Sequence, residues 1–360
     1  MKRENQLSVW LELLRYPAFS VENDRVAYMN EKAKALMLLS GEDILPILAT
    51  GQEEYLAFTT GCLCLTVTVQ GQTRPACVQM VEGYKVFLLE EGEDTEGLRM
   101  LSLTAQSLRN PLGDVMSATD SLLPVLAHWE DPMIHEQMAR LNQGLYQMLR
   151  IISNMSDAGE YLTGGRVFAP ESTELGGFFQ ELFQKAADLG TGTVQIDFQC
   201  PRDLIDAYID RQKMERAVYN LLSNAIQHTP AGGRIHARLE KKGKRAWLSI
   251  FNEGVKLDAG GQTDLFFRYR REASLENPDR GVGLGLPIAR QVAALHGGVI
   301  LLTQTDGGLQ ATMSMGLHQP EGCNLGSPRL QPDYAGCRDH CLVELSGVLP
   351  ASVFETGNIN

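Results

Sequence analysis

The sequence predicts an α+β protein with several domains, because three kinds of periodicity follow one another along the chain. Apolar and polar residues alternate over much of residues 62–89, as they do in strands that are buried on one side. Apolar residues then recur at three- and four-residue steps through residues 98–127 and 133–162, which is typical of amphipathic helices. Helical and strand patterns finally alternate over residues 172–317 and predict an α/β sandwich with a mixed sheet under helices.

Composition argues against several classes of protein. The 360 residues are enough for two or three domains, and the formal net charge is −12 with no compensating basic block, so we expect no nucleic-acid binding. No apolar run approaches the roughly 20 residues of a membrane-spanning helix. The N-terminal stretch carries charges and lacks a small-residue cleavage site, so we expect no signal peptide. These features predict a cytoplasmic protein with reduced cysteines.

Residues 8–90 form the first predicted domain, a small α+β module. A helix is followed by strands at Ala18–Val21 and Arg25–Met29, a second helix, and three antiparallel strands within residues 62–89. This order resembles a compact PAS domain, most visibly at PAFSVENDRVAYMNEKA, so the module is expected to be a sensor. If this module has a pocket, no histidine or cysteine pair in that pocket announces a haem or a metal site.

Residues 98–163 are predicted to form an antiparallel helical hairpin, after an acidic joint at 90–97. Its apolar stripes consist of Leu101, Leu108, Leu112, Val115, Leu122, Leu126, Met138, Leu141, Leu145, Met148 and Ile152. Two helices cannot bury such stripes alone, which favours pairing with a second copy into a dimeric four-helix bundle. The alternative is packing of the hairpin against the first module.

Two motifs of the third domain, residues 172–317, point to a nucleotide. Asn220 and Asn224 stand four residues apart, so both amides project from one helix face, and amide oxygens suit Mg²⁺. The loop GVGLGL, residues 281–286, precedes a clear helix, and such glycines let backbone N–H groups approach phosphates. Together the motifs predict Mg-ATP as the ligand.

The order of motifs resembles that of the histidine-kinase and gyrase-type ATPases. The stretch from Asn220 to Asn224 is similar to their N box, Asn252-Glu-Gly254 to their first glycine box, and GVGLGL to their second. LFFRYRR, ending at Arg271, is similar to their phenylalanine box. SLRNPLGDVMSATDSLL in the hairpin resembles the dimerisation and phosphoacceptor helix of sensor histidine kinases, the proteins of two-component signalling.

The resemblance implies an ATP site and names its residues. Asn220 and Asn224 would hold Mg²⁺ and the phosphates. Asn252 stands where the family usually has an aspartate that bonds the adenine amino group, and its carbonyl oxygen can accept the same bond. The full set of expected ATP-binding residues is Asn220, Asn224, Asn252, Gly254, Phe266, Arg271, Gly281, Gly283, Leu284, Gly285 and Leu286.

The phosphoacceptor position departs from the family. Gln106 stands where the family has its histidine, and Ser107 replaces the neighbouring acidic residue. Phosphoryl transfer needs an imidazole nitrogen as nucleophile, whereas the lone pair of an amide nitrogen is delocalised into the carbonyl. A carboxylate acting as general base contributes roughly 10²- to 10⁴-fold. We therefore expect autophosphorylation to fail.

Several functions stay open. The first is a pseudokinase that binds ATP, switches conformation and partners another histidine kinase or a response regulator in a phosphorelay. The second is a phosphatase of a phosphorylated response regulator, in which Asn110 and Gln106 orient water. The third is an active protein-histidine kinase, as the family classification implies. An ATPase machine resembling gyrase or the chaperones is a further class, which the hairpin and the sensor-like module disfavour.

Residues 318–360 form a tail rich in Pro, Gly and Cys. Its last part is too apolar to be wholly disordered, and the sequence assigns it no role. Cys337, His340 and Cys341 lie close together but lack the Cys-x₂-Cys-like spacing of a zinc site, so a small packed motif is expected instead.

Overall fold

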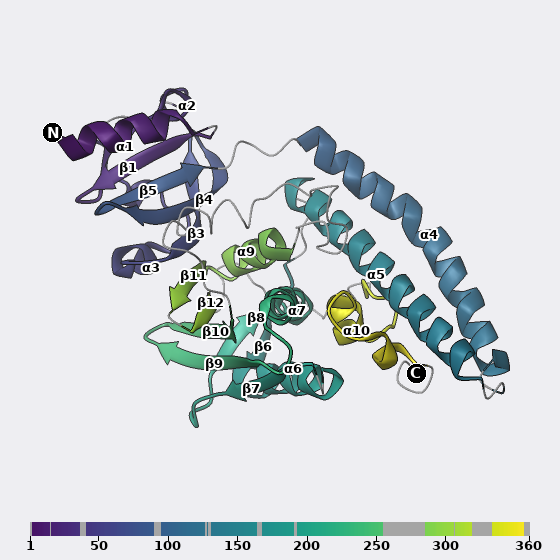
Figure 1. Cartoon of the computed structure of the whole chain (residues 1–360). Helices are drawn as coiled ribbons and strands as arrows, with labels where there is room; N and C mark the ends of the chain where they lie inside the picture. Colours follow the sequence, from purple (N-terminus) through teal and green to yellow (C-terminus); the bar gives the residue numbers. More distant parts are fainter. Residues whose placement is uncertain are drawn as a thin grey trace.

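The computed structural model describes residues 2–14, 16–36, 41–89, 95–126, 128, 131–163, 168–190, 193–254, 285–305, 307–318 and 333–355. The N-terminal module and the helical hairpin lie at opposite ends of the molecule, and an α/β unit lies between them (Figure 1). No helix within these ranges combines the length and the apolar character of a membrane span.

The N-terminal module is an antiparallel sheet with short helices. Its elements are α1 (Lys2–Glu12), β1 (Ala18–Glu22), β2 (Arg25–Met29), α2 (Glu31–Lys34), η1 (Leu45–Ile47), α3 (Gln52–Ala57), β3 (Cys62–Val69), β4 (Gln72–Val81) and β5 (Tyr84–Leu89). The strand order is β2-β1-β5-β4-β3. Asn23 and Asp24 have positive φ angles, which these residue types tolerate, and they close the β1–β2 turn. The predicted strands are confirmed.

Two long helices form the predicted hairpin, α4 (Thr95–Leu126) and α5 (Pro132–Thr163). One side of the hairpin is packed, with Leu112, Leu145 and Ile152 buried. A second stripe stays exposed, and its α4 members recur every seven residues. It consists of Leu101, Leu108, Val115 and Leu122 on α4, with Leu141 and Met148 on α5.

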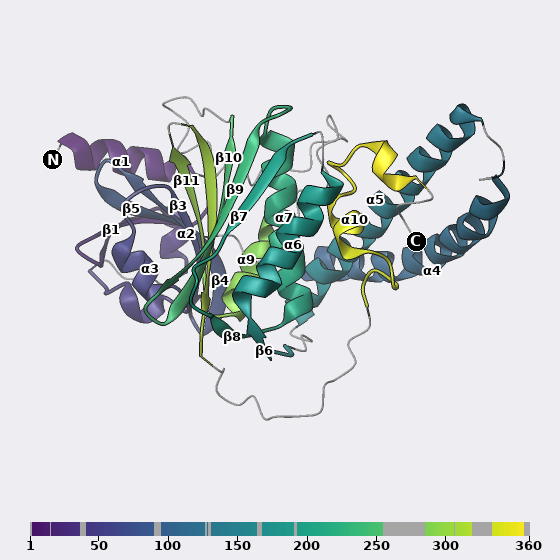
Figure 2. The same cartoon turned by 90° about the horizontal axis from the view of Figure 1, so that it is seen from below.

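The α/β unit has helices on one face of a mixed sheet (Figure 2). Its elements are β6 (Glu171–Glu174), α6 (Leu175–Leu189), β7 (Gln195–Gln199), β8 (Asp206–Ile209), α7 (Arg211–His228), β9 (Arg234–Lys242), β10 (Arg245–Glu253), α9 (Gly285–Leu295), β11 (Ile300–Thr305) and β12 (Gly308–Gly316). The strands β11-β12-β10-β9 pair antiparallel, and β7 joins β9 in parallel. The predicted mixed sheet under helices is confirmed.

The two sheets are joined edge to edge, which the sequence does not indicate. Strand β3 pairs antiparallel with β11, so that Cys64 faces Ile300 and Cys62 faces Leu302, and a single ten-stranded sheet results. Gly61 precedes this junction with φ of 93°, and a Cβ there would lie 2.3 Å from the carbonyl oxygen of Leu302. Backbone edges carry no sequence pattern of their own, which is why the junction escapes prediction.

The tail folds back onto the molecule. Its described part holds α10 (His340–Leu345) and η3 (Ala351–Phe354), which lie between α5 and the helices of the α/β unit (Figure 2). The ring of Phe354 packs edge-on against Tyr146 of α5, at 5.5 Å between centroids. Asn142 and Gln143 of α5 donate hydrogen bonds to backbone carbonyls of the tail, at 2.8–3.1 Å.

Candidate functional site

Helix α7 carries the first two residues of the candidate site. Asp210 caps its N-terminus, where the side chain accepts a hydrogen bond from the Lys213 backbone N–H at 3.2 Å. Asn220 is fully buried, whereas Asn224, one turn later, is partly exposed. The two amides are therefore not equivalent, although the sequence places them on one face.

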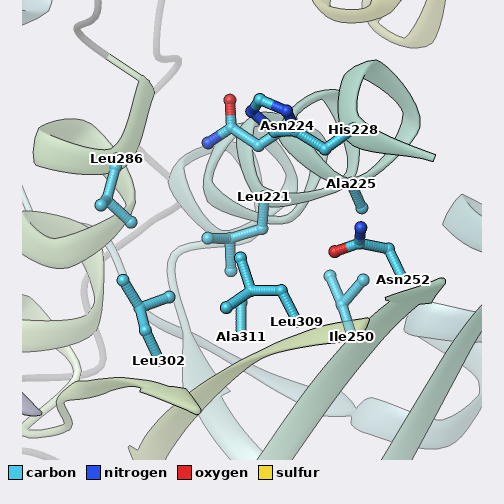
Figure 3. A pocket seen from close by; sticks show the side chains of 10 residues that line it. All are labelled: Leu221, Asn224, Ala225, His228, Ile250, Asn252, Leu286, Leu302, Leu309 and Ala311. Atoms are coloured by element: carbon cyan, nitrogen blue, oxygen red, sulfur yellow. The ribbon is translucent and has the colours of Figure 1, made fainter. Parts of the chain in front are cut away.

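A pocket lies between α7, α9 and strands β10 to β12 (Figure 3). Its cavity volume is about 20 Å³, and the total empty space between its walls, open solvent included, is about 330 Å³. It is lined by Leu221, Asn224, Ala225, His228, Ile250, Asn252, Leu286, Leu302, Leu309 and Ala311. Most of this lining is apolar, and the polar groups come from α7 and from Asn252 on β10. A flat apolar ring with a polar edge fits such a lining.

Asn252 is the unusual residue of this pocket. Its side chain projects from β10 toward α7, and only 4% of the residue is exposed (Figure 3). The Nδ2 group is buried and donates no hydrogen bond within the described part of the chain. A buried polar group without a partner costs about 1–3 kcal/mol. A ligand with an acceptor at this position would remove that cost.

Two glycines of the predicted boxes are required by close packing. Gly254 has φ of 103°, and a Cβ there would lie 2.5 Å from Pro230 Cδ. At Gly285, a Cβ would lie 2.7 Å from Asn220 Oδ1. The start of α9 therefore lies directly against the buried amide of α7. The remaining predicted residues of these boxes, Phe266, Arg271, Gly281, Gly283 and Leu284, lie outside the described residues.

Both polar atoms of the Asn220 side chain already have hydrogen-bond partners. Its Nδ2 group donates to the carbonyl of Arg216 at 2.9 Å, and its Oδ1 atom accepts from Arg150 of α5 at 3.4 Å. Arg150 also donates to Ser223 Oγ at 3.1 Å. A cation from the hairpin helix therefore faces the oxygen that the sequence assigns to Mg²⁺.

A buried ion cluster holds α5, α7 and the tail together. Glu344 of α10 is completely buried and lies 3.0 Å from Arg216 Nε and 3.6 Å from Arg150 Nε. Arg216 further donates to Asn154 Oδ1 at 2.8 Å and pairs with Asp157 of α5. Burial lowers the pKa of Arg150, an effect that Glu344 opposes. Sequence reasoning missed this cluster, because its members are too far apart in the chain to form a motif.

A second polar contact fastens the tail. His340 Nδ1 lies 2.9 Å from Glu215 Oε2, and His340 Nε2 lies 2.9 Å from Asp333 Oδ1. The hydrogen bond to Glu215, with help from Asp333, raises the pKa of His340 to about 9. The imidazole is therefore protonated at neutral pH and donates from both nitrogens.

The position that the sequence predicts for the phosphoacceptor lies on α4. Gln106 and Asn110 are both exposed there, one helical turn apart. Ser107 Oγ donates to the Leu103 carbonyl at 2.9 Å and so bonds its own helix. No carboxylate replaces the missing acidic residue at that position.

Comparisons with known proteins agree with the order of the motifs. Residues 209–319 match the family model described as histidine kinase-, DNA gyrase B-, and HSP90-like ATPase. The adaptive-response sensory kinase SasA of Synechococcus sp. is 28% identical over 240 residues, covering 63% of this chain and 62% of the relative. Histidine kinase P4 of Formosa agariphila is 24% identical over 214 residues, covering 58% of this chain and 16% of the relative.

Among solved structures, histidine kinase ThkA in complex with response regulator protein TrrA matches 86% of this chain and 98% of that chain, with a TM-score of 0.41 and 15% identity. The chain spans less than two thirds of the length of the curated relatives named above. The ATPase family model covers the region in which the predicted boxes occur in order. Residues 209–319 therefore match the histidine kinase-, DNA gyrase B-, and HSP90-like ATPase family, and the chain is similar to sensor histidine kinases.

Proposed function

We propose that the pocket between α7 and β10 binds Mg-ATP, in a signalling protein that does not phosphorylate itself. The observation that carries the ATP part is the buried, unpartnered amide of Asn252 at the end of an apolar pocket. We propose the same division into domains as the sequence predicts: a PAS-like module at 8–90, the hairpin at 98–163 and the ATP-binding domain at 172–317. The short helices between β2 and β3 and the five-stranded antiparallel sheet support the PAS-like assignment.

Adenine carries the hydrogen-bonding groups that the side-chain amide of Asn252 needs as partners. The carboxamide can accept from the exocyclic amino group through Oδ1 and donate to the adjacent ring nitrogen through Nδ2. Leu221, Ile250 and Leu309 offer apolar surface to the faces of the ring. The family aspartate can only accept at neutral pH, so Asn252 exchanges charge assistance for a second hydrogen bond.

The metal role is best given to Asn224. Its amide lies at the partly exposed edge of the pocket, and an amide oxygen is the hard ligand that Mg²⁺ takes. Asn220 fits the same ion only after Arg150 has left its Oδ1 atom, because a guanidinium and a metal ion cannot share that oxygen. A bound Mg²⁺ would neutralise charge on the nucleotide phosphates.

ATP calorimetry on three single variants tests the site. Asn252→Ala is expected to weaken binding roughly 10- to 100-fold, because it removes one hydrogen-bonded edge. Asn252→Asp restores the family residue and is expected to retain binding. Ser249→Ala is the matched control, since Ser249 lies on the same strand and bonds Thr312 at 3.1 Å outside the pocket. Unchanged affinity in Asn252→Ala would refute the adenine assignment.

The absence of autophosphorylation rests on Gln106 and Ser107. Neither side chain offers a nucleophile activated by a base, so γ-labelled ATP is expected to leave no acid-labile phosphate on the protein. The assay should include Asn224→Ala as a control for nucleotide-dependent background. Acid-labile labelling that disappears when one histidine is substituted would instead support an active protein-histidine kinase.

A regulator phosphatase is the second candidate function. Gln106 and Asn110 favour it, because two exposed amides on successive turns of α4 can orient a water molecule. The test is phosphate release from a phosphorylated response regulator, with Gln106→Ala and Asn110→Ala beside the exposed control Gln137→Ala. If the parent protein gives no faster release than the regulator alone, the phosphatase is excluded and a pseudokinase role remains.

We also propose that the hairpin forms a homodimer and meets its regulator there. The exposed heptad-spaced stripe on α4, formed by Leu101, Leu108, Val115 and Leu122, supports this. Such a seam is stable in water only when a second apolar surface covers it. Sedimentation of the full chain tests the dimer, and a concentration-independent monomer would contradict it.

A further inference from the structure

Three buried cysteines of the N-terminal module lie together on one face of its sheet. Cys62 and Cys64 stand two residues apart on β3, so their side chains share a face, and Cys77 of β4 is directly opposite Cys64. The three residues are only 2–4% exposed. Their Sγ atoms lie within 4.8 Å of one another, and those of Cys64 and Cys77 are 3.4 Å apart. The sequence does not announce this cluster, because Cys77 joins the other two cysteines only through the pairing of β3 with β4.

We propose that Cys62, Cys64 and Cys77 form a binding site for one thiophilic metal ion, with Cu(I) as the best match. An ion about 2.3 Å from each of three sulfurs in one plane would hold those sulfurs about 4.0 Å apart. The Sγ atoms of Cys64 and Cys77 are 3.4 Å apart, and no pair among the three is farther apart than 4.8 Å. Small side-chain rotations would bring the sulfurs to a common ion.

The donor set favours Cu(I) over Zn²⁺. Thiolates are soft ligands that select Cu(I), Zn²⁺ or iron–sulfur clusters, but protein Zn²⁺ sites are almost always four-coordinate. The residue opposite Cys62 is the buried Gln79, whose amide is a hard and weak donor for a soft ion. Three sulfurs without a fourth strong ligand suit the trigonal geometry that Cu(I) accepts.

A positively charged side chain beside the cluster also favours a complex of one cation with three thiolates, whose net charge is negative. The guanidinium of Arg290 on α9 lies 3.9 Å from Cys77 Sγ and offsets part of the negative charge of deprotonated sulfurs. Cysteine binds a metal ion as the thiolate, so metal binding releases protons.

The location links the cluster to the ATP-binding domain. Cys62, Leu63 and Cys64 are the β3 residues that pair with β11, and α9 also contacts β3. The same helix begins at Gly285, against Asn220. Occupation of the thiol cluster would thus act on the junction between the module and the candidate nucleotide site. This last step rests on the proposed ATP function, whereas metal binding itself does not.

Competition against a chromogenic Cu(I) chelator, with the full reduced chain and no nucleotide, tests the proposal. The parent is expected to bind one Cu(I) per chain in competition with the chelator, and its affinity for Cu(I) should fall as pH is lowered. Cys64→Ser and Cys77→Ser are expected to weaken binding by about 100-fold or more, since even groups behind a ligand contribute 10- to 100-fold. Cys200→Ser and Cys337→Ser, both at exposed thiols, are the controls and should bind as the parent does.

Each other outcome is decisive. A parent chain that folds, contains three reduced buried thiols and retains no Cu(I) would overturn the site. Retention of Zn²⁺ but not Cu(I) would overturn the three-coordinate assignment, as would X-ray absorption showing other than three sulfur neighbours. Circular dichroism separates unfolding of a serine variant from loss of a ligand. ATP calorimetry on the same variants is independent, so failure of the nucleotide site would not be mistaken for failure of the metal site.

Discussion

Substitution of Glu344 by glutamine should release the tail from the rest of the molecule. Glu344 is completely buried and carries the negative charge that faces both Arg150 and Arg216. Glutamine has nearly the same size, so the change removes the charge without leaving a cavity. Arg216 keeps Asp157 and Asn154 as partners, whereas Arg150 pairs with no other carboxylate within the described residues.

The size of the effect follows from the burial. Removing one partner of a buried ion pair typically costs about 3–5 kcal/mol, because the other charge stays buried without compensation. The remaining partners of Arg216 place this case at the lower end, near 3 kcal/mol. Because only the docking of the tail is lost, the equilibrium between docked and undocked tail should shift by roughly 100-fold or more.

Hydrogen exchange of the α10 amides is the direct assay, and the rate of limited proteolysis of the tail is a second assay. In Glu344→Gln, exchange at α10 should accelerate by the same factor of roughly 100, while β9 and β10 remain protected. Glu355→Gln is the matched control, since Glu355 lies exposed at the end of the same tail. Equal protection of α10 in parent and Glu344→Gln would refute the view that this ion cluster holds the tail.

Three further predictions concern other contacts. Protonated His340 stabilises the docked tail. Because its folded pKa of about 9 lies above the usual 6.5, this stabilisation is complete below pH 6.5 and is lost as pH rises through 9. Proteolysis of the tail should therefore accelerate near pH 9 in the parent and not in His340→Gln. Gly285→Ala places a methyl group 2.7 Å from Asn220 Oδ1, and the thermal midpoint is expected to fall with a cost of about 1–3 kcal/mol. In Gly61→Ala the added Cβ would lie 2.3 Å from the Leu302 carbonyl oxygen, so the β3–β11 junction should break and hydrogen exchange at β11 should become faster. Gly71→Ala is the control, because Gly71 also has a positive φ but has open space around it, and this variant should leave the junction intact. Unaltered β11 exchange in Gly61→Ala would contradict the edge-to-edge junction.

Much of the fold follows from local patterns. The alternation in residues 62–89 and the stripes of α4 and α5 were sufficient to predict the strands and the hairpin, because side-chain periodicity is fixed by the backbone of each element. The sequence did not distinguish the two amides of the N box. Asn224 lines the pocket, whereas Asn220 is buried against Gly285. This difference depends on where α9 lies, which the sequence pattern of α7 does not contain.

The sequence by itself indicated the similarity to sensor histidine kinases, the candidate ligand and the glutamine at the predicted phosphoacceptor position 106, because each depends on residues that are close together in the chain. Only the tertiary structure decided that Arg150 meets Asn220 across 70 positions and that Glu344 meets Arg216 across 128. It alone showed that the thiols of β3 and β4 lie beside the junction with β11, at the edge of the α/β sheet. These contacts unite residues distant in the chain, and their stability comes from burial and from charges facing each other in a medium of low dielectric, which no local pattern encodes.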